Sequence, residues 1–234
     1  TNIISMLSIS GGEINQLINK QIGITLISIL SSIVISMTNI RFIFYHSYHI
    51  YILVLLSLIA TDLLGYKVMG AKRWINLGMV NIQPSEFMKI AIVLALSRFF
   101  HNCHIDSIKK LNNLIFPFMI ILLPILLILK QPNLGTSLII LFTSLNILFI
   151  SGVKIRFFVY LGLSTSLSLP VIWNFLRDYQ KTRIMTFLGS DNDNLGAGYN
   201  IAQSIISIGS GGFSGQGFLK GSQNQLDFLP ENHT

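Results

Sequence analysis

Basic and acidic side chains gather in one polar stretch between two apolar segments of this chain. Lys72, Arg73 and Trp74 lie near the beginning of the stretch, and Glu86 and Lys89 follow its end. Arginine binds phosphate as a bidentate fork, whereas lysine binds it as a point charge. The stretch therefore has the residue types that hold a phosphorylated headgroup at a membrane surface.

The same residues also have purely structural interpretations. Trp74 would act as an anchor at the membrane interface. Glu86 and Lys89 are three positions apart and share one face of a helix, either as an ion pair that pins this helix to its neighbour or as a polar wall facing a lipid headgroup. We expect Ser85 to cap this helix at its N-terminus. The negative charge of Glu86, in the first turn, should interact favourably with the helix dipole.

Two further polar features border apolar segments. Asp62 lies near the end of one segment, where an ionisable side chain needs a partner or a function. Gln131, Pro132 and Asn133 interrupt another apolar run, and proline does not continue a helix in the ordinary way. We expect a tight connection between two helices there.

The elements that position these residues must lie in a membrane. Of the 234 residues, 51% are hydrophobic and only 11% are charged, whereas soluble domains carry about 25% charged residues. The net charge of +7 is spread along the chain on basic residues that stand mostly singly, without the basic stripe of a nucleic-acid-binding protein. Six apolar segments are expected to be membrane helices: 22–37, 50–64, 87–100, 114–129, 136–150 and 157–176.

These apolar runs are continuous rather than alternating, which excludes a membrane β-barrel and favours helices. We therefore expect an all-α, polytopic membrane protein with one membrane domain in residues 1–176, connected by short loops. The basic residues, six in one set of loops and five in the other, do not decide its orientation. Residues 177–234 are polar and rich in glycine. Within them, Ile201, Ile205 and Ile208 predict a short helix at the membrane surface.

Metal and cofactor sites are not expected. Cys103 is the only cysteine and lies near His101 and His104, but structural zinc takes four well-spaced ligands. The glycines of 209–217 match neither the phosphate-loop spacing nor the dinucleotide fingerprint. Nothing in the sequence specifically indicates a divalent cation.

Blocks across most of the chain resemble the SEDS family of cell-wall synthases, in the family's order. They are GAKRWINLG (70–78), IQPSEFMKIA (82–91), QPNLGTS (131–137), DYQKTRIM (178–185), LGAGYNIAQSIISIGSGG (195–212) and GSQNQLDFLPENHT (221–234). The last two look more like the elongation branch of the family than its division branch.

The resemblance implies the SEDS fold of about ten spans, of which about six are present here. It implies a peptidoglycan glycosyltransferase that polymerises lipid II into glycan strands during elongation and maintenance of rod shape. The partners would be a class B penicillin-binding protein and the elongation machinery, at the bacterial cytoplasmic (inner) membrane. Residues 177–234 would form a large extracytoplasmic loop, truncated at its end, and the Trp74 loop would face the same side.

The resemblance also assigns site residues. Those expected to bind substrate are Lys72, Arg73, Trp74, Glu86, Lys89, Gln131, Tyr179, Gln180 and Arg183. Glu231 and His233 would support an essential family aspartate that would follow Thr234, so we expect the 234-residue chain alone to be inactive. Asn133 stands where the family usually has aspartate. This departure leaves two interpretations, a fragment of a family member or a degraded copy of one.

The proposed chemistry joins a sugar hydroxyl to an anomeric carbon that carries a lipid diphosphate. It needs a base for the hydroxyl and cations for the departing diphosphate, for which Lys72, Arg73, Lys89 and Arg183 are candidates. Trp74 would stack on the sugar or line the lipid groove. Two alternatives remain: a flippase that moves the lipid-linked precursor and needs no base, and an inactive scaffold for the penicillin-binding protein.

Overall fold

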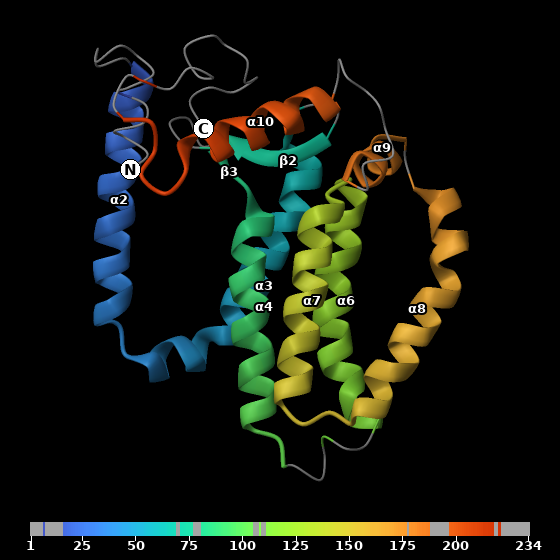
Figure 1. Cartoon of the computed structure of the whole chain (residues 1–234). Helices are drawn as coiled ribbons and strands as arrows, with labels where there is room; N and C mark the ends of the chain where they lie inside the picture. The colour runs from blue at the N-terminus through green and yellow to red at the C-terminus, as the bar shows by residue number, and fades with distance from the viewer. Residues whose placement is uncertain are drawn as a thin grey trace. The chain divides into compact units, whose positions relative to one another are not determined.

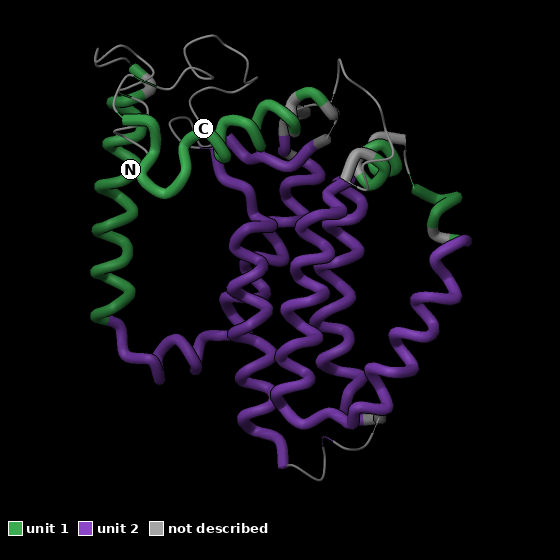
Figure 2. The backbone as a smooth tube through the Cα atoms, in the orientation of Figure 1, with its two compact units in different colours: residues 1–37, 171–234 green, residues 38–170 purple. Residues whose placement is uncertain are grey.

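The computed structural model describes residues 7, 16–68, 71–76, 81–104, 108, 111–176, 178–187, 197–217 and 220. The chain divides into two compact units (Figure 2). The first comprises Thr1–Met37 with Val171–Thr234, and the second comprises Thr38–Pro170.

The first unit contains helix α2 and the two helices near the carboxyl end. Their bounds are Gln16–Met37 for α2, Asp178–Phe187 for α9 and Ala197–Gly211 for α10. The amphipathic helix predicted around Ile201, Ile205 and Ile208 is confirmed as α10, and its position at the membrane surface stays a prediction. Helix α9 was missed, because its polar sequence has no clear apolar face.

The second unit contains the helical bundle and a small sheet at one of its ends (Figure 1). Its helices are α3 (Ile40–Leu64), α4 (Pro84–His101), the short 3₁₀ helix η1 (Leu111–Leu114), α6 (Ile115–Lys130), α7 (Leu134–Ile150) and α8 (Ile155–Phe175), whose last residues belong to the first unit. Helix α4 packs against α3, α6 and α7.

Each of the six predicted apolar segments lies almost entirely within one helix, so the helical membrane fold is confirmed. Among the described residues, two helices, over Ile18–Met37 and Ile40–Leu63, are long and apolar enough to cross a bilayer, and the stretches Ile115–Lys130, Leu134–Ile150 and Ile155–Val171 are shorter apolar helices. The predicted start of the second segment at residue 50 is wrong. Residues 40–49 belong to the same helix, because the hydrogen bonds of a helix join backbone groups four residues apart and form with polar as well as apolar side chains.

A three-stranded antiparallel sheet replaces the loop expected between α3 and α4. Strand β1 (Tyr66–Val68) pairs with β2 (Ala71–Asn76), which pairs with β3 (Asn81–Ile82). Tyr66 lies opposite Trp74 across the first pair. The all-α prediction therefore lacked this sheet. Backbone groups outside a helix still need partners, and strand pairing supplies them.

Gly65 makes the turn from α3 into β1. Its N–H donates to the carbonyl oxygen of Thr61, with an N···O distance of 2.9 Å. A Cβ at Gly65 would clash with this same oxygen. The end of α3 therefore requires glycine for close approach rather than for an unusual backbone angle.

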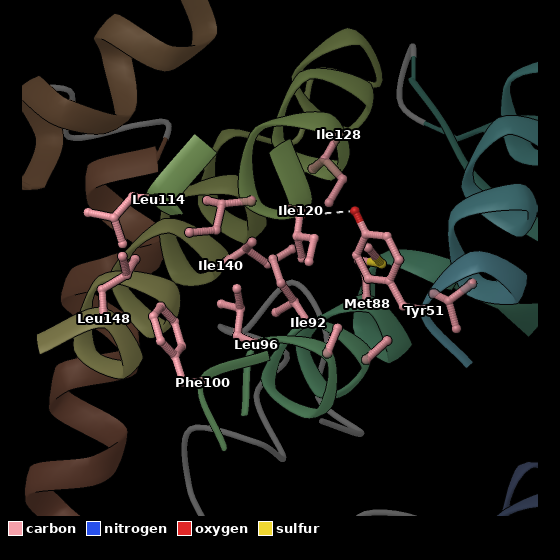
Figure 3. Close-up of a cluster of buried hydrophobic side chains, with 14 of the residues drawn as sticks. Tyr51, Met88, Ile92, Leu96, Phe100, Leu114, Ile120, Ile128, Ile140 and Leu148 are labelled. Atoms are coloured by element: carbon pink, nitrogen blue, oxygen red, sulfur yellow. Dashed lines mark hydrogen bonds between the residues drawn. The ribbon is translucent and has the colours of Figure 1, made fainter. Parts of the chain in front are cut away.

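The core lies where α3, α4, α6 and α7 meet (Figure 3). Met88, Ile92 and Leu96 follow each other at four-residue spacing on α4 and are fully buried. They meet Ile128 of α6 and Ile140 of α7 in one apolar cluster. Large apolar side chains also cover the outer faces of these helices, as expected where lipid replaces water.

One buried hydrogen bond joins α3 to α6. The Tyr51 hydroxyl donates to the carbonyl oxygen of Ile120 at 2.9 Å (Figure 3). In a regular helix this oxygen would accept from the residue four positions on, which here is Pro124 and has no N–H. Tyr51 thus supplies the donor that the proline removes.

Candidate functional site

The sheet end of the second unit brings together six of the predicted site residues. They are Lys72, Arg73 and Trp74 on β2, Glu86 and Lys89 at the start of α4, and Gln131 after the end of α6. Strand β2 contacts both α3 and α4. The polar residues that the sequence separates thus belong to one end of one bundle.

Glu86 and Lys89 form an ion pair within α4. The Lys89 Nζ lies 2.7 Å from the Glu86 Oε2, and the two side chains are 30% and 51% exposed. Glu86 lies in the first turn, as predicted. The expected ion pair is therefore present on one face of α4, and its roles as a link to a neighbouring helix or as a polar wall facing a headgroup stay predictions.

The predicted cap at Ser85 is also wrong. Helix α4 begins at Pro84, with Gln83 in the N-cap position. Proline suits the first helical position because it lacks an N–H that would have no partner there. Ser85 is buried instead and accepts a hydrogen bond from the Gln83 Nε2 at 3.0 Å.

Asp62 has the ionic partner that its position demands. Its Oδ2 lies 2.6 Å from the Nζ of Lys130 at the end of α6. The Asp62 side chain is 25% exposed and that of Lys130 is 71% exposed. Sequence reasoning missed Lys130 because only the packing of α3 beside α6 brings it to Asp62.

Lys72 and Arg73 donate to backbone carbonyls near helix ends. The Lys72 Nζ donates to the carbonyl oxygen of Asp62 at 3.2 Å. The Arg73 Nε donates to the carbonyl oxygen of Gln131 at 3.2 Å, and its Nη2 donates to that of Pro132. The Asp62 carbonyl lies in the last turn of α3, where regular helix donors run out, and the other two carbonyls lie in the turn after α6, so both cations supply donors and positive charge at helix C-termini.

The predicted tight turn between α6 and α7 is confirmed, since α6 ends at Lys130 and α7 begins at Leu134. Gln131 is 4% exposed, and its Nε2 donates to the carbonyl oxygen of Leu58 on α3 at 3.0 Å. The Asn133 Oδ1 accepts from the Thr136 N–H at 3.5 Å and caps α7. Aspartate would cap this helix equally well.

The remaining predicted residues belong to the other unit or fall outside the description. Tyr179, Gln180 and Arg183 lie on α9, where Gln180 is half-buried and the other two side chains are not described. Glu231 and His233 lie outside the described residues. Among the residues that are described, no group of three or more His, Cys, Asp or Glu side chains could hold a metal ion.

Comparison with known proteins gives a family match over nearly the whole chain. The profile of the family FtsW/RodA/SpoVE, described as cell cycle protein, matches residues 2–234. The peptidoglycan glycosyltransferase MrdB of Escherichia coli is 42% identical over 187 residues, which cover 80% of this chain and 50% of MrdB. The chain thus spans about half the length of the curated relatives it matches.

Solved structures share the fold. One, described as a peptidoglycan synthase complex that coordinates polymerization and crosslinking, has a TM-score of 0.71 and 29% identity, over 84% of this chain and 58% of that one. The rod shape determining protein RodA of Thermus thermophilus has a TM-score of 0.61 and 24% identity, over 71% of this chain and 54% of that one. The latter identity supports the fold alone.

Proposed function

The chain belongs to the FtsW/RodA/SpoVE family of cell cycle proteins, and we propose that it is a RodA-type peptidoglycan glycosyltransferase that polymerises lipid II. The observation that carries the proposal is its 42% identity over 187 residues to a protein named for this activity. Described residues of three of the family's blocks, 70–78, 82–91 and 131–137, also lie at one end of the helical bundle of the second unit, as a site for a lipid-linked substrate requires.

The proposed reaction needs a cation at the departing diphosphate and a surface for the sugar. Among the cations described in the second unit, Lys89 is the best placed, because its partner Glu86 holds it at the start of α4 while its side chain stays partly exposed. Half-buried Trp74 offers a ring on which a sugar would stack. Tyr179, Gln180 and Arg183 of α9 stay predicted substrate-binding residues.

Assembly and location follow as parts of the same proposal. A class B penicillin-binding protein would crosslink the strands, in line with the synthase complex that shares the fold. The protein would cross the bacterial inner membrane several times, with residues 177–234 and the Trp74 strand on the outer side. Glu231 and His233 would lie beside the carboxylate that serves as the base.

The decisive experiment supplies lipid II to the purified protein, produced from its whole reading frame together with a crosslinking-deficient penicillin-binding partner. We expect glycan strands on a gel, and fewer strands from Lys89→Met. The exposed cation Lys154 provides the matched control, since Lys154→Met should polymerise normally.

Other outcomes separate the alternatives. Transport of labelled lipid II across vesicles without polymer would favour a flippase. Absence of both, with crosslinking by the native partner still stimulated, would favour a scaffold. Either result would refute the glycosyltransferase proposal.

A further inference from the structure

Three elements at the sheet end are tied to each other in a closed circuit. Gln131, in the turn between α6 and α7, donates to Leu58 of α3. Arg73 of β2 donates back to the carbonyl oxygen of Gln131. Lys72 of β2 donates to the carbonyl oxygen of Asp62 on α3 and closes the circuit. No element can shift without breaking a bond to one of the others.

The circuit holds β2 at two consecutive residues. Lys72 is tied to the end of α3 and Arg73 to the turn after α6, at the place where an irregularity interrupts the pairing of β1 with β2. Trp74 is the next residue along β2. The Asp62–Lys130 ion pair adds a second tie between α3 and the end of α6. The strand that carries Trp74 is thus held by the side chains of the two residues before it.

We propose that Arg73 and Gln131 are positioning residues, which hold the Trp74 strand in place for a diphosphate-linked lipid and do not themselves bind the phosphate. The identity of the ligand rests on the proposed function, whereas the circuit does not. This assignment replaces the role as a phosphate fork that the sequence suggested for Arg73.

The geometry at Arg73 favours positioning over ligand binding. Its Nε and Nη2 reach the carbonyl oxygens of two consecutive residues, Gln131 and Pro132. A guanidinium presents two donors in a rigid fork, and a lysine amine cannot reproduce this arrangement. Phosphate would have to displace both carbonyl oxygens from the guanidinium before it could bind there.

The test uses Trp74 as its own reporter. Trp74 and Trp173 are the only tryptophans, so a Trp173→Phe background isolates the Trp74 fluorescence. In nanodiscs, two quantities are measured: quenching by acrylamide without ligand, and affinity for undecaprenyl diphosphate as the probe. For Arg73→Lys, we expect quenching to rise about twofold and affinity to fall about tenfold, because one charge-assisted bond of the fork is lost.

Two variants serve as controls. Arg156→Lys changes an exposed arginine in the first turn of α8 and should alter neither quantity. Lys89→Met should weaken the binding of the probe without changing the quenching. If Arg73→Lys does not accumulate, Lys72→Met opens the same circuit at its other bond and should raise the quenching alike.

The possible results are distinct. Arg73→Lys with normal quenching but lost affinity would make Arg73 a direct ligand and overturn the proposal. Normal quenching with normal affinity would also overturn it. If the unaltered protein does not bind the probe, the proposed function fails, and increased quenching in Arg73→Lys still establishes the circuit.

Discussion

The bond from Tyr51 to Ile120 makes a specific prediction about how α6 tolerates its proline. Tyr51→Phe removes one hydroxyl and keeps the ring in the core. The Ile120 carbonyl oxygen then loses the donor that lies 2.9 Å away, in a residue that is only 6% exposed. The N–H four residues on cannot replace this donor, because residue 124 is proline.

The expected cost follows from burial and from the missing helix donor. An unsatisfied buried carbonyl costs about 1–3 kcal/mol, whereas hydrogen bonds between membrane helices average about 0.6 and reach about 1.7 kcal/mol. We expect Tyr51→Phe to lower the free energy of unfolding by about 1.5 kcal/mol, in the upper part of the membrane range, because the carbonyl has no regular alternative.

A double-mutant cycle isolates the role of the proline. Pro124→Ala restores an N–H that can donate to the Ile120 oxygen along the helix. In that background Tyr51→Phe should cost about 0.5 kcal/mol or less, which leaves a coupling of about 1 kcal/mol. Equal costs in both backgrounds would refute the conclusion that Tyr51 compensates for Pro124.

The assay is thermal unfolding in detergent, followed by reversible denaturation in mixed micelles to obtain the free energies. A loss of 1 kcal/mol corresponds to about 2–4 °C in a chain of this size. Tyr160→Phe provides the matched control, because Tyr160 is 68% exposed on α8. This control should leave the midpoint unchanged, and a similar fall there would show that the assay reports tyrosine removal in general.

Three further predictions concern topology, charge and backbone. A membrane-impermeant thiol reagent should leave Cys103 unlabelled in intact cells and label it in opened ones, and ready labelling of intact cells would invert the proposed topology. Lys89→Met should lower the free energy of unfolding by less than about 1 kcal/mol, because the pair with Glu86 is partly exposed, and a larger loss in thermal unfolding would show that the pair is structural. Gly65→Ala should cost about 1–3 kcal/mol in the same measurement, because a Cβ meets the Thr61 oxygen, and a neutral result would show that α3 can end differently.

The sequence by itself determined the six apolar helices and the family. Apolar runs long enough for a membrane allow only helices, since each backbone group must find a partner within its own segment. The six runs therefore located six helices, and Gln131 to Asn133 located the turn after α6. These features depend on interactions a few residues apart, which a linear pattern displays directly.

Only the tertiary structure decided which partners the polar residues take. The sequence placed Arg73 beside Trp74 as a phosphate ligand, but the packing of β2 against the bundle brings its guanidinium to the Gln131 carbonyl. Asp62 likewise meets Lys130 because α3 and α6 are neighbours. Backbone carbonyls have no sequence signature, and the end of a helix exposes them in a direction that depends on the fold. The difference between a cation that binds substrate and one that holds a strand is therefore a property of the folded chain.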